Sequence, residues 1–259
     1  MTMTLYHGEP NGPSLTVLAA LFETGIEAAL VHIDLPGGAR HQPPVPTAPE
    51  VAMSVEGEGP VLVADGTAMV DSVFIGQALD EMAGGNILLP TDPYERWEVT
   101  TWCRWIIERI APAAAYIGTR ETLAPALAAM DEQAFAALSE KIESVDLKAR
   151  WTATRANDFD DAKLTDSEAK IDAAVAKIEK QLEGKEWLFE SFGLADLESF
   201  AWLSSMVVFV PLAFTHASRT QSWMERVARR SSVARALALA SVPDPRRSWA
   251  PGPEINRWG

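Results

Sequence analysis

The order of strand-like and helix-like patterns along the chain restricts its fold more than any other feature. Up to residue 85 the two kinds of pattern alternate, whereas from residue 91 onward every strong pattern is helical. Two strands joined through a helix normally pair in parallel. We therefore expect two domains, residues 1–85 and 91–259, of which only the first contains a sheet.

The first region reads as a strand, a helix and a second strand, followed by a hairpin and a helix. TLYHG is strand-like, Pro13 suits the first turn of a helix, and the helical stripe that follows ends at Gly25. AALVHIDL is the second strand pattern. After the irregular residues 36–56, PVLVADGTAMV predicts a hairpin and DSVFIGQALDEMAGG a helix. This order of elements is that of a thioredoxin-like fold.

The second region reads as a series of amphipathic helices. The first begins with Thr91 or Asp92 as a cap, and Pro112 should kink or interrupt it. Polar residues 145–164 are expected to form a spacer, and FAWLSSMVVFVPLAF a single buried core helix. Further helices are expected near residues 131–144, 165–183, 219–228 and 232–240.

Charge and cysteine content argue against several classes of protein. The chain has 22 basic and 36 acidic side chains, a formal net charge of −14, so we expect no general nucleic-acid-binding surface. Cys103, the single cysteine, cannot form an internal disulfide and is expected to be a buried, unreactive thiol. Four histidines without a zinc-type spacing predict no metal site. The N-terminus lacks a signal-peptide pattern and no stretch suits a membrane span, so we expect a cytoplasmic protein.

Short motifs in both regions resemble those of one superfamily. Pro60 opens a strand, Asp71 and Ser72 stand at the next helix start, and EPNGPSLTVL places Ser14 in the first turn of the first helix. GLADLESFAW has the pattern of an N-capped turn before a buried helix. Together they resemble the glutathione transferase superfamily over essentially the whole chain. LLPTDPYERWEVTTWCRWIIER, AYIG and the spacer at 145–164 are most similar to the bacterial β-etherases, the lignin-degrading glutathione transferases.

The resemblance implies an α/β thioredoxin-like N-terminal domain followed by an all-α C-terminal domain, with glutathione as co-substrate. A cis bond before Pro60 would expose the backbone of Gly59 to the peptide, as to an added strand. Asp71 would bind the ammonium of the γ-glutamyl end, and Ser72 its α-carboxylate at the helix start. Taken alone, Asp71-Ser72 is more typical of a simple helix cap; Pro60 at the family spacing favours the binding role.

The same resemblance places the reactive thiol at the start of the first helix. A helix N-terminus and one hydrogen-bond donor can lower a thiol pKa, and Ser14 is the expected donor, with Asn11 as the alternative. In relatives, the proline-rich loop contacts the glycine end of glutathione, so Arg40 or His41 would meet that carboxylate; a solvated polar loop is an equal alternative. Three aromatic residues are expected to line the substrate pocket, Trp105, Tyr116 and Trp249.

Several positions depart from the family pattern. SVEGEGP replaces the usual motif before the strand, and Gly59 replaces a β-branched residue, which should make the peptide contact less preorganised. Pro13 stands where β-etherases carry an asparagine. Gly193 stands where relatives carry a serine or threonine cap, a change expected to cost only about a few tenths of a kcal/mol.

Three functions follow from the resemblance. The first is glutathione-dependent cleavage of β-aryl ethers in lignin-derived aromatic ketones. The second is a non-catalytic subunit that stabilises an active relative in a heterodimer, which the altered motif and Pro13 favour. The third is a glutathione transferase of other specificity. In each case we expect a dimer, a homodimer or a heterodimer with a related transferase, formed through a helix of the first domain and the entry helix of the second.

Overall fold

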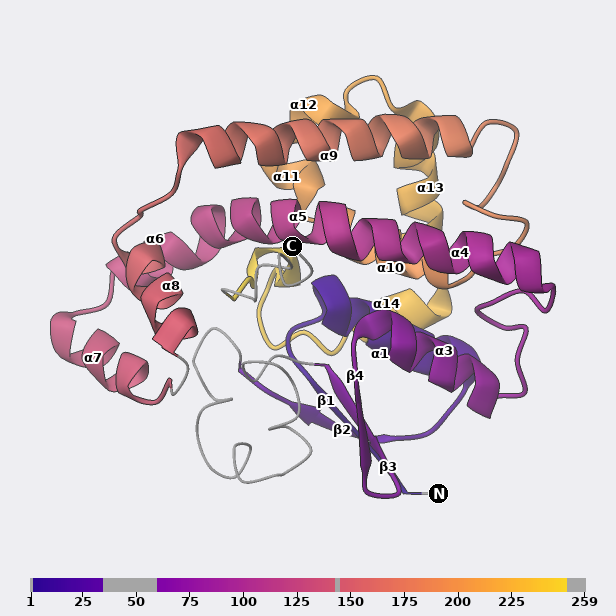
Figure 1. Ribbon diagram of the computed structural model, residues 1–259, viewed down its shortest axis with the longest axis horizontal. Helices are drawn as coiled ribbons and strands as arrows, with labels where there is room; N and C mark the ends of the chain where they lie inside the picture. The colour runs from indigo at the N-terminus through magenta and orange to yellow at the C-terminus, as the bar shows by residue number, and fades with distance from the viewer. Residues whose placement is uncertain (1, 35–59, 143–144, 251–259) are drawn as a thin grey trace.

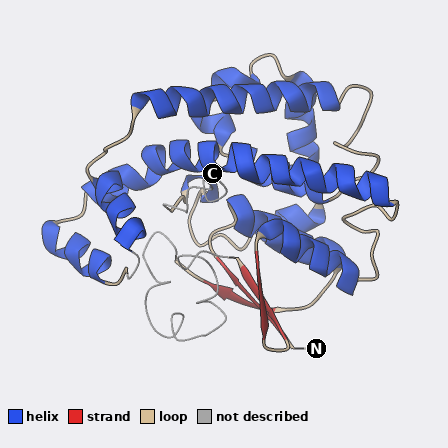
Figure 2. Ribbon diagram, viewed as in Figure 1, coloured by secondary structure: helices blue, strands red, loops and turns tan. Residues whose placement is uncertain are grey.

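The computed structural model describes residues 2–34, 60–142 and 145–250. Within these residues one sheet contains β1 (Met3–His7), β2 (Ala29–His32), β3 (Val61–Ala64) and β4 (Thr67–Val70), in the order β2-β1-β3-β4. β1 and β2 pair in parallel, whereas β3 is antiparallel to both β1 and β4 (Figure 2). This is the thioredoxin-like arrangement predicted from the sequence.

Two helices connect the sheet to the rest of the molecule. α1 (Gly12–Thr24) and α3 (Ser72–Met82) lie between the sheet and the helical part in Figure 1. α1 packs against α3 and against two helices of the C-terminal part, α10 and α14. Gly25, with φ +70°, ends α1 as predicted, because glycine adopts this left-handed conformation without steric cost.

The C-terminal part consists of helices and the loops between them, and its described residues contain no strand. α4 (Pro93–Trp105) begins at Asp92, whose carboxylate accepts the N–H groups of Tyr94 and Glu95, so the predicted cap is confirmed. No helix in the described ranges is both long and apolar enough to cross a membrane. The helices that follow are α5 (Ala111–Gly118), α6 (Ala124–Ala128), α7 (Glu132–Glu140), α8 (Val145–Arg155), α9 (Asp161–Gln181), α10 (Leu194–Leu203), α11 (Met206–Phe209), α12 (Pro211–Phe214), α13 (Ser218–Arg229) and α14 (Ser231–Leu237).

Two π-helical turns accommodate the prolines in the long helical segment. Ile106–Ile110 and Thr119–Leu123 each form one such turn, and each is followed by an alanine and then a proline, Pro112 or Pro125. Proline cannot donate to the helical ladder, and its ring crowds the carbonyl one turn earlier. A π turn widens the ladder at that point. α4 and α5 therefore continue in roughly the same direction in Figure 1, with a local interruption instead of a sharp bend.

The expected polar spacer at 145–164 is wrong in its first half, because residues 145–155 form α8. Leu147 and Trp151, four residues apart, face the same side of this helix and are buried. They pack with Phe135 and Leu138 of α7 in a second, smaller hydrophobic core. Few side chains of α8 are apolar, but one of them is a buried tryptophan, whose large apolar surface stabilises the packing of the helix.

The run FAWLSSMVVFVPLAF is not a single buried helix. α10 ends at Leu203, and the short α11 and α12 follow with a break at Val210, just before Pro211. The side chain of Leu212 is 85% exposed. Pro211 starts α12, and the chain changes direction just before it. This change of direction brings Leu212 to the surface.

Position 193, just before α10, requires glycine because its backbone lies close to Leu88, in the segment that links the N-terminal and C-terminal parts of the chain. A β-carbon on Gly193 would lie 2.4 Å from the carbonyl oxygen of Leu88, and the next N–H, of Leu194, donates to that same oxygen at 2.9 Å. Leu88 is held in turn by Asp80, which accepts its N–H at 2.7 Å. The expectation of a merely weakened cap at Gly193 therefore misses the steric requirement.

We predict that Gly193→Ser destabilises the protein although serine is the better helix cap. The added side chain forces the Leu88 backbone to move, and such overpacking costs about 1–3 kcal/mol. Chemical denaturation measures the change, with the exposed cap replacement Asp131→Ser as a control that should be nearly neutral. A Gly193→Ser protein as stable as the parent would contradict this account.

Candidate active site

The topology of the sheet brings three predicted site segments to one edge. Tyr6 pairs with Val61 and Val61 with Val70, so β1 and β4 run in the same direction and end at the same edge. β3 is antiparallel to both, so it begins at this edge, directly after Pro60. Because α1 follows β1 and α3 follows β4, both helices start here, and their positive dipole ends lie at one edge of the sheet.

The turn before α1 presents two buried polar side chains. Asn11 caps α1, with its Oδ1 accepting the N–H of Gly12 at 3.0 Å and the hydroxyl of Ser205 at 3.1 Å. Its Nδ2 is buried without a partner in the described ranges. Ser14 is 3% exposed and its Oγ accepts the N–H of Gly8 at 3.0 Å, which leaves its own hydrogen to donate. No acidic residue lies in the first turn of α1.

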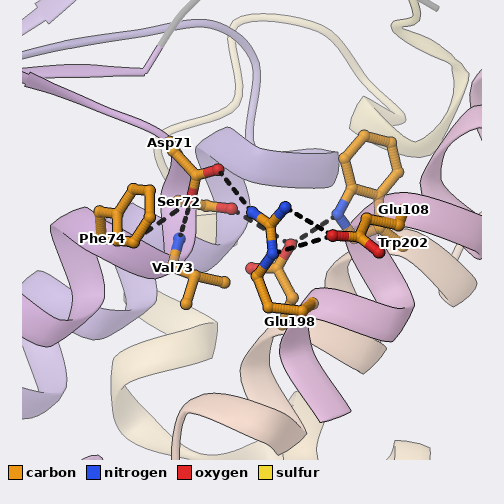
Figure 3. A network of polar contacts seen from close by, with 8 residues as sticks. Asp71, Ser72, Val73, Phe74, Glu108, Glu198 and Trp202 are labelled. Carbon is orange, nitrogen blue, oxygen red and sulfur yellow. Dashed lines mark hydrogen bonds and ion pairs between the residues drawn. The ribbon is translucent and has the colours of Figure 1, made fainter. Parts of the chain in front are cut away.

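The start of α3 is capped by its own aspartate. Asp71 Oδ1 accepts the N–H groups of Val73 at 2.9 Å and Phe74 at 3.3 Å, and Oδ2 lies 3.7 Å from Arg104 (Figure 3). The predicted helix cap is therefore present, and these two amides are already bonded. Asp71 also has φ +74°, a conformation that is unfavourable for a non-glycine residue. Such strain in a native structure is often found at functional sites.

Ser72 is tied to a buried carboxyl group of the C-terminal part. Its Oγ donates to Oε1 of Glu198 in α10 at 3.1 Å, and Nε1 of Trp202 donates to the same oxygen at 2.7 Å (Figure 3). Burial raises the pKa of Glu198 to about 7, against the opposing effect of the Trp202 hydrogen bond. The proposed carboxylate-binding hydroxyl thus touches a group that titrates near neutral pH.

The C-terminal segment folds back over the α1 turn. The backbone N–H of Ser241 donates to Glu9 Oε2 at 3.0 Å, the Ser241 hydroxyl bonds the same carboxylate, and His32 Nε2 lies 3.0 Å from Glu9 Oε1. Further along, the ring of Trp249 lies 5.7 Å from that of Trp202, measured between centroids. The Trp202 ring in turn covers the position where a side chain on Gly12 would lie. Two aromatic rings therefore form a wall beside the start of α1.

The remaining predicted residues lie elsewhere or outside the described residues. Trp105 packs against Trp102 and has the Lys177 ammonium 3.5 Å from its ring centroid, so it faces α9. The Tyr116 hydroxyl accepts the N–H of Asp160, the residue that caps the start of α9. The structure therefore does not group these two aromatic residues with Trp249. Three predicted glutathione ligands, Arg40, His41 and Gly59, lie outside the described residues, as does the peptide bond before Pro60.

This arrangement suits an extended anionic peptide that carries a thiol. Asp71 offers a carboxylate for an ammonium group, Ser72 offers a hydroxyl whose hydrogen is donated to Glu198 in this structure, and the start of α1 offers donors and a positive dipole end for a thiolate. In the described part of the chain no three His, Cys, Asp or Glu side chains gather as a metal-binding group. Burial raises the pKa of the Cys103 thiol well above the usual value, which disfavours the thiolate form.

Comparison with known proteins agrees with this geometry, although no family model matches the chain. Protein LigF of Sphingobium sp. (strain NBRC 103272 / SYK-6) is 27% identical over 205 residues, which cover 78% of this chain and 77% of LigF. The crystal structure of β-etherase LigF from Sphingobium sp. strain SYK-6 matches with a TM-score of 0.82 at 23% identity, covering 92% of this chain and 99% of that one. Glutathione transferase F7 from Populus trichocarpa matches with a TM-score of 0.68 at 21% identity, covering 91% and 99%.

The chain therefore shares the fold of the glutathione transferases and is similar in sequence to LigF. A glutathione transferase from Pseudomonas putida, solved with glutathione disulfide bound, also shares the fold, with a TM-score of 0.64 at 17% identity over 94% of this chain and 92% of that one. The predicted fold class is confirmed by these structures.

Four further residues contribute to the site but were not predicted from the sequence. Glu198 and Trp202 both lie in α10, and Glu9 and Ser241 join the C-terminal segment to the α1 turn. An acid within the apolar pattern LADLESFAWL was a usable signal for Glu198, because a charge on a buried helix needs a partner. The contact between Glu9 and Ser241 spans almost the whole chain and leaves no local pattern.

We predict that Gly118→Ala displaces the Trp249 indole from its position against α5. A β-carbon at this position of α5 would lie 2.5 Å from Cδ1 and Nε1 of the Trp249 indole. Helix propensity alone would make the substitution stabilising by about 0.5–1 kcal/mol. We expect instead a red-shifted tryptophan fluorescence, together with the faster proteolysis after residue 240 that a Trp249→Ala control should also show. Unchanged emission and unchanged proteolysis would show that the segment tolerates the methyl group.

Proposed function

We propose that this transferase cleaves β-aryl ether bonds of lignin-derived aromatic ketones with glutathione. The observation that carries the proposal is the meeting of the α1 and α3 starts at one sheet edge, with Ser14 and Asn11 on one side and Asp71 and Ser72 on the other. Similarity to LigF, a β-etherase, supports an enzyme of this type. The bound glutathione disulfide of the Pseudomonas putida transferase supports glutathione as the co-substrate.

In the proposed reaction the glutathione sulfur attacks the carbon that carries the aryl ether, next to the ketone. A carbon–sulfur bond forms, the carbon–oxygen bond breaks with its electron pair, and a phenolate leaves and takes up a proton from water. Ser14 donates a hydrogen bond to the thiolate, with Asn11 Nδ2 as a second available donor. Asp71 and Ser72 hold the γ-glutamyl end, and the Trp202–Trp249 wall packs against the aromatic substrate.

A direct assay tests the proposed reaction. The purified protein is incubated with glutathione and a β-aryl ether ketone, and the products are identified by mass spectrometry. We expect equal amounts of the phenol and of the glutathione thioether of the ketone. Turnover of an activated aryl halide without ether cleavage would assign a transferase of other specificity. Lack of turnover with every electrophile would contradict the proposed reaction.

One observation favours a second candidate, a non-catalytic subunit of a heterodimer. The Ser72 hydroxyl and the N–H groups of Val73 and Phe74 already have partners within the chain, so these three donors are not free for a ligand carboxylate. Co-expression with an active relative tests this reading. It predicts a stable heterodimer in which Ser14→Ala leaves the ether cleavage by the relative unchanged.

We also propose that the protein dimerises through α3 and α4. Three large apolar side chains of these neighbouring helices are exposed, Phe74 by 56%, Tyr94 by 65% and Trp97 by 57%. Large exposed apolar side chains on adjacent helices often mark an interface. We predict that Trp97→Glu shifts the sedimentation coefficient from dimer to monomer, whereas Leu212→Glu on the exposed α12 does not. A parent protein that is already monomeric at micromolar concentration would refute the proposal.

A further inference from the structure

The carboxyl group of Glu198 lies beneath the proposed γ-glutamyl site and is only partly satisfied. Its Oε1 accepts hydrogen bonds from Ser72 Oγ and Trp202 Nε1, at 3.1 and 2.7 Å. The side chain is fully buried, and Oε2 makes no hydrogen bond to any described residue, although the Thr16 hydroxyl is near enough to stabilise the ionised form. A carboxylate has about four acceptor positions, so an ionised Glu198 is poorly solvated here.

The charged groups around Glu198 also disfavour its ionised form. Asp71, at the end of β4, adds a negative charge that acts in the same direction as burial on the Glu198 pKa. Arg104 of α4 lies 3.7 Å from Asp71 and is shared with Glu108, at 2.6 Å. Cys103 of α4 stays neutral, and Asp196 of α10 is a further acid on the same helix. Glu198 is thus poised to gain or lose a proton near neutral pH.

The single hydrogen of the Ser72 hydroxyl creates a conflict when a ligand binds. A hydroxyl can donate to one acceptor at a time, and in the structure Ser72 donates to Glu198. A ligand carboxylate at Ser72 would need that same hydrogen. If Glu198 is neutral, its own proton can be donated to Ser72 Oγ, and the Ser72 hydrogen is released for the ligand.

We propose that binding of the glutathione α-carboxylate at Ser72 is coupled to uptake of one proton by Glu198. This inference rests on the proposed function, because it takes glutathione as the ligand of this site. The ligand's negative charge disfavours an ionised Glu198 still further, so the bound state holds the proton more tightly than the free state. Glu198 acts on the ligand through Ser72 and is therefore a positioning residue.

The coupling has a definite sign. The neutral form of Glu198 is the form that binds, and with a pKa of about 7 in the free protein it is abundant below neutral pH. Above that pH a proton must be taken up with each ligand, so the affinity should fall by about tenfold per pH unit. Below about pH 6 the affinity should not depend on the protonation of Glu198.

Isothermal titration calorimetry with S-methylglutathione measures the coupling directly, because this ligand has no thiol to titrate. Titrations at pH 6, 7 and 8, each in two buffers of different ionisation enthalpy, give the number of protons taken up. We expect almost none at pH 6, about half a proton at pH 7 and close to one at pH 8. Binding at pH 8 without proton uptake would overturn the inference while leaving glutathione binding intact.

Two variants separate a proton-coupled role from a structural one. Glu198→Gln keeps the shape and cannot ionise, so its affinity should be independent of pH and about tenfold above that of the parent at pH 8. Ser72→Ala should bind weakly at every pH and without proton uptake. A merely structural Glu198 would give a glutamine variant with the same pH dependence as the parent. Failure of the parent to bind at pH 6 would instead refute the proposed function itself.

Discussion

Asp196→Ala is expected to cause the largest loss of stability of any substitution considered. The Asp196 carboxylate is buried at the start of α10 and accepts three hydrogen bonds, from the N–H of Leu188 at 3.1 Å, the N–H of Gly193 at 3.1 Å and Nε1 of Trp223 at 2.7 Å. Each buried donor left without a partner costs about 1–3 kcal/mol, so we expect a total of about 4 kcal/mol or more. A typical domain has only about 5–15 kcal/mol of stability, so much of the variant should be insoluble or unfolded.

Urea denaturation of Asp196→Ala, with the exposed Asp172→Ala as control, tests this expectation. The control should stay within about 0.5 kcal/mol of the parent. Asp196→Asn should fall between the two, because its amide oxygen can still accept from Leu188 and Trp223 while its amide group faces the N–H of Gly193. An Asp196→Ala protein that unfolds at the parent's urea concentration would show that this carboxylate does not hold α10, α13 and the preceding segment together.

Local sequence patterns correctly predicted those features of the fold that neighbouring residues determine. The cap of α4 at Asp92, the stop of α1 at Gly25 and the hairpin between β3 and β4 each depend on a few neighbouring residues. The parallel pairing of β1 and β2 followed from the helix between them. Once these strands and helices are known, the order and direction of the strands alone place the starts of α1 and α3 side by side.

The failures occur where a distant residue decides the structure. Gly193 looked like a weak cap, because nothing nearby in the sequence shows the Leu88 carbonyl against which it packs. α8 was missed because its buried face consists of few apolar residues, although Leu147 and Trp151 have helical spacing. For the site, sequence similarity identified Ser72, but its partner Glu198 is visible only after α10 has packed against α3.

Ser14→Ala is expected to have the largest effect on activity. It removes one hydrogen bond to the glutathione thiolate, worth roughly 1.5–3 kcal/mol. The thiol pKa should rise by about one to two units, at about 1.36 kcal/mol per unit. The kcat/KM at neutral pH should then fall by roughly tenfold to a hundredfold, with partial recovery at higher pH, where solvent alone ionises the thiol. The exposed Ser222→Ala on α13 serves as control and should retain full activity.

Loss of Ser14 also leaves the N–H of Gly8 without its acceptor, so activity must be compared per folded molecule. Recovery at high pH separates the two effects, because a destabilised turn would lower the rate at every pH. If Ser14→Ala has the parent's pH–rate profile and Asn11→Ala does not, the thiolate is stabilised by Asn11 Nδ2. If neither variant changes the profile, the start of α1 does not activate the thiol.

The most direct test of thiolate stabilisation at the α1 start is the pKa of glutathione bound to the unmodified protein. Ultraviolet difference absorbance reports the thiolate, and a titration of the complex gives this pKa without any electrophile or turnover. A free cysteine-type thiol has a pKa of about 8.5, and we predict a value at least one unit lower in the complex. A bound thiol that titrates at the free value would contradict the account, because the helix start and its donors would then leave the sulfur as it is in water.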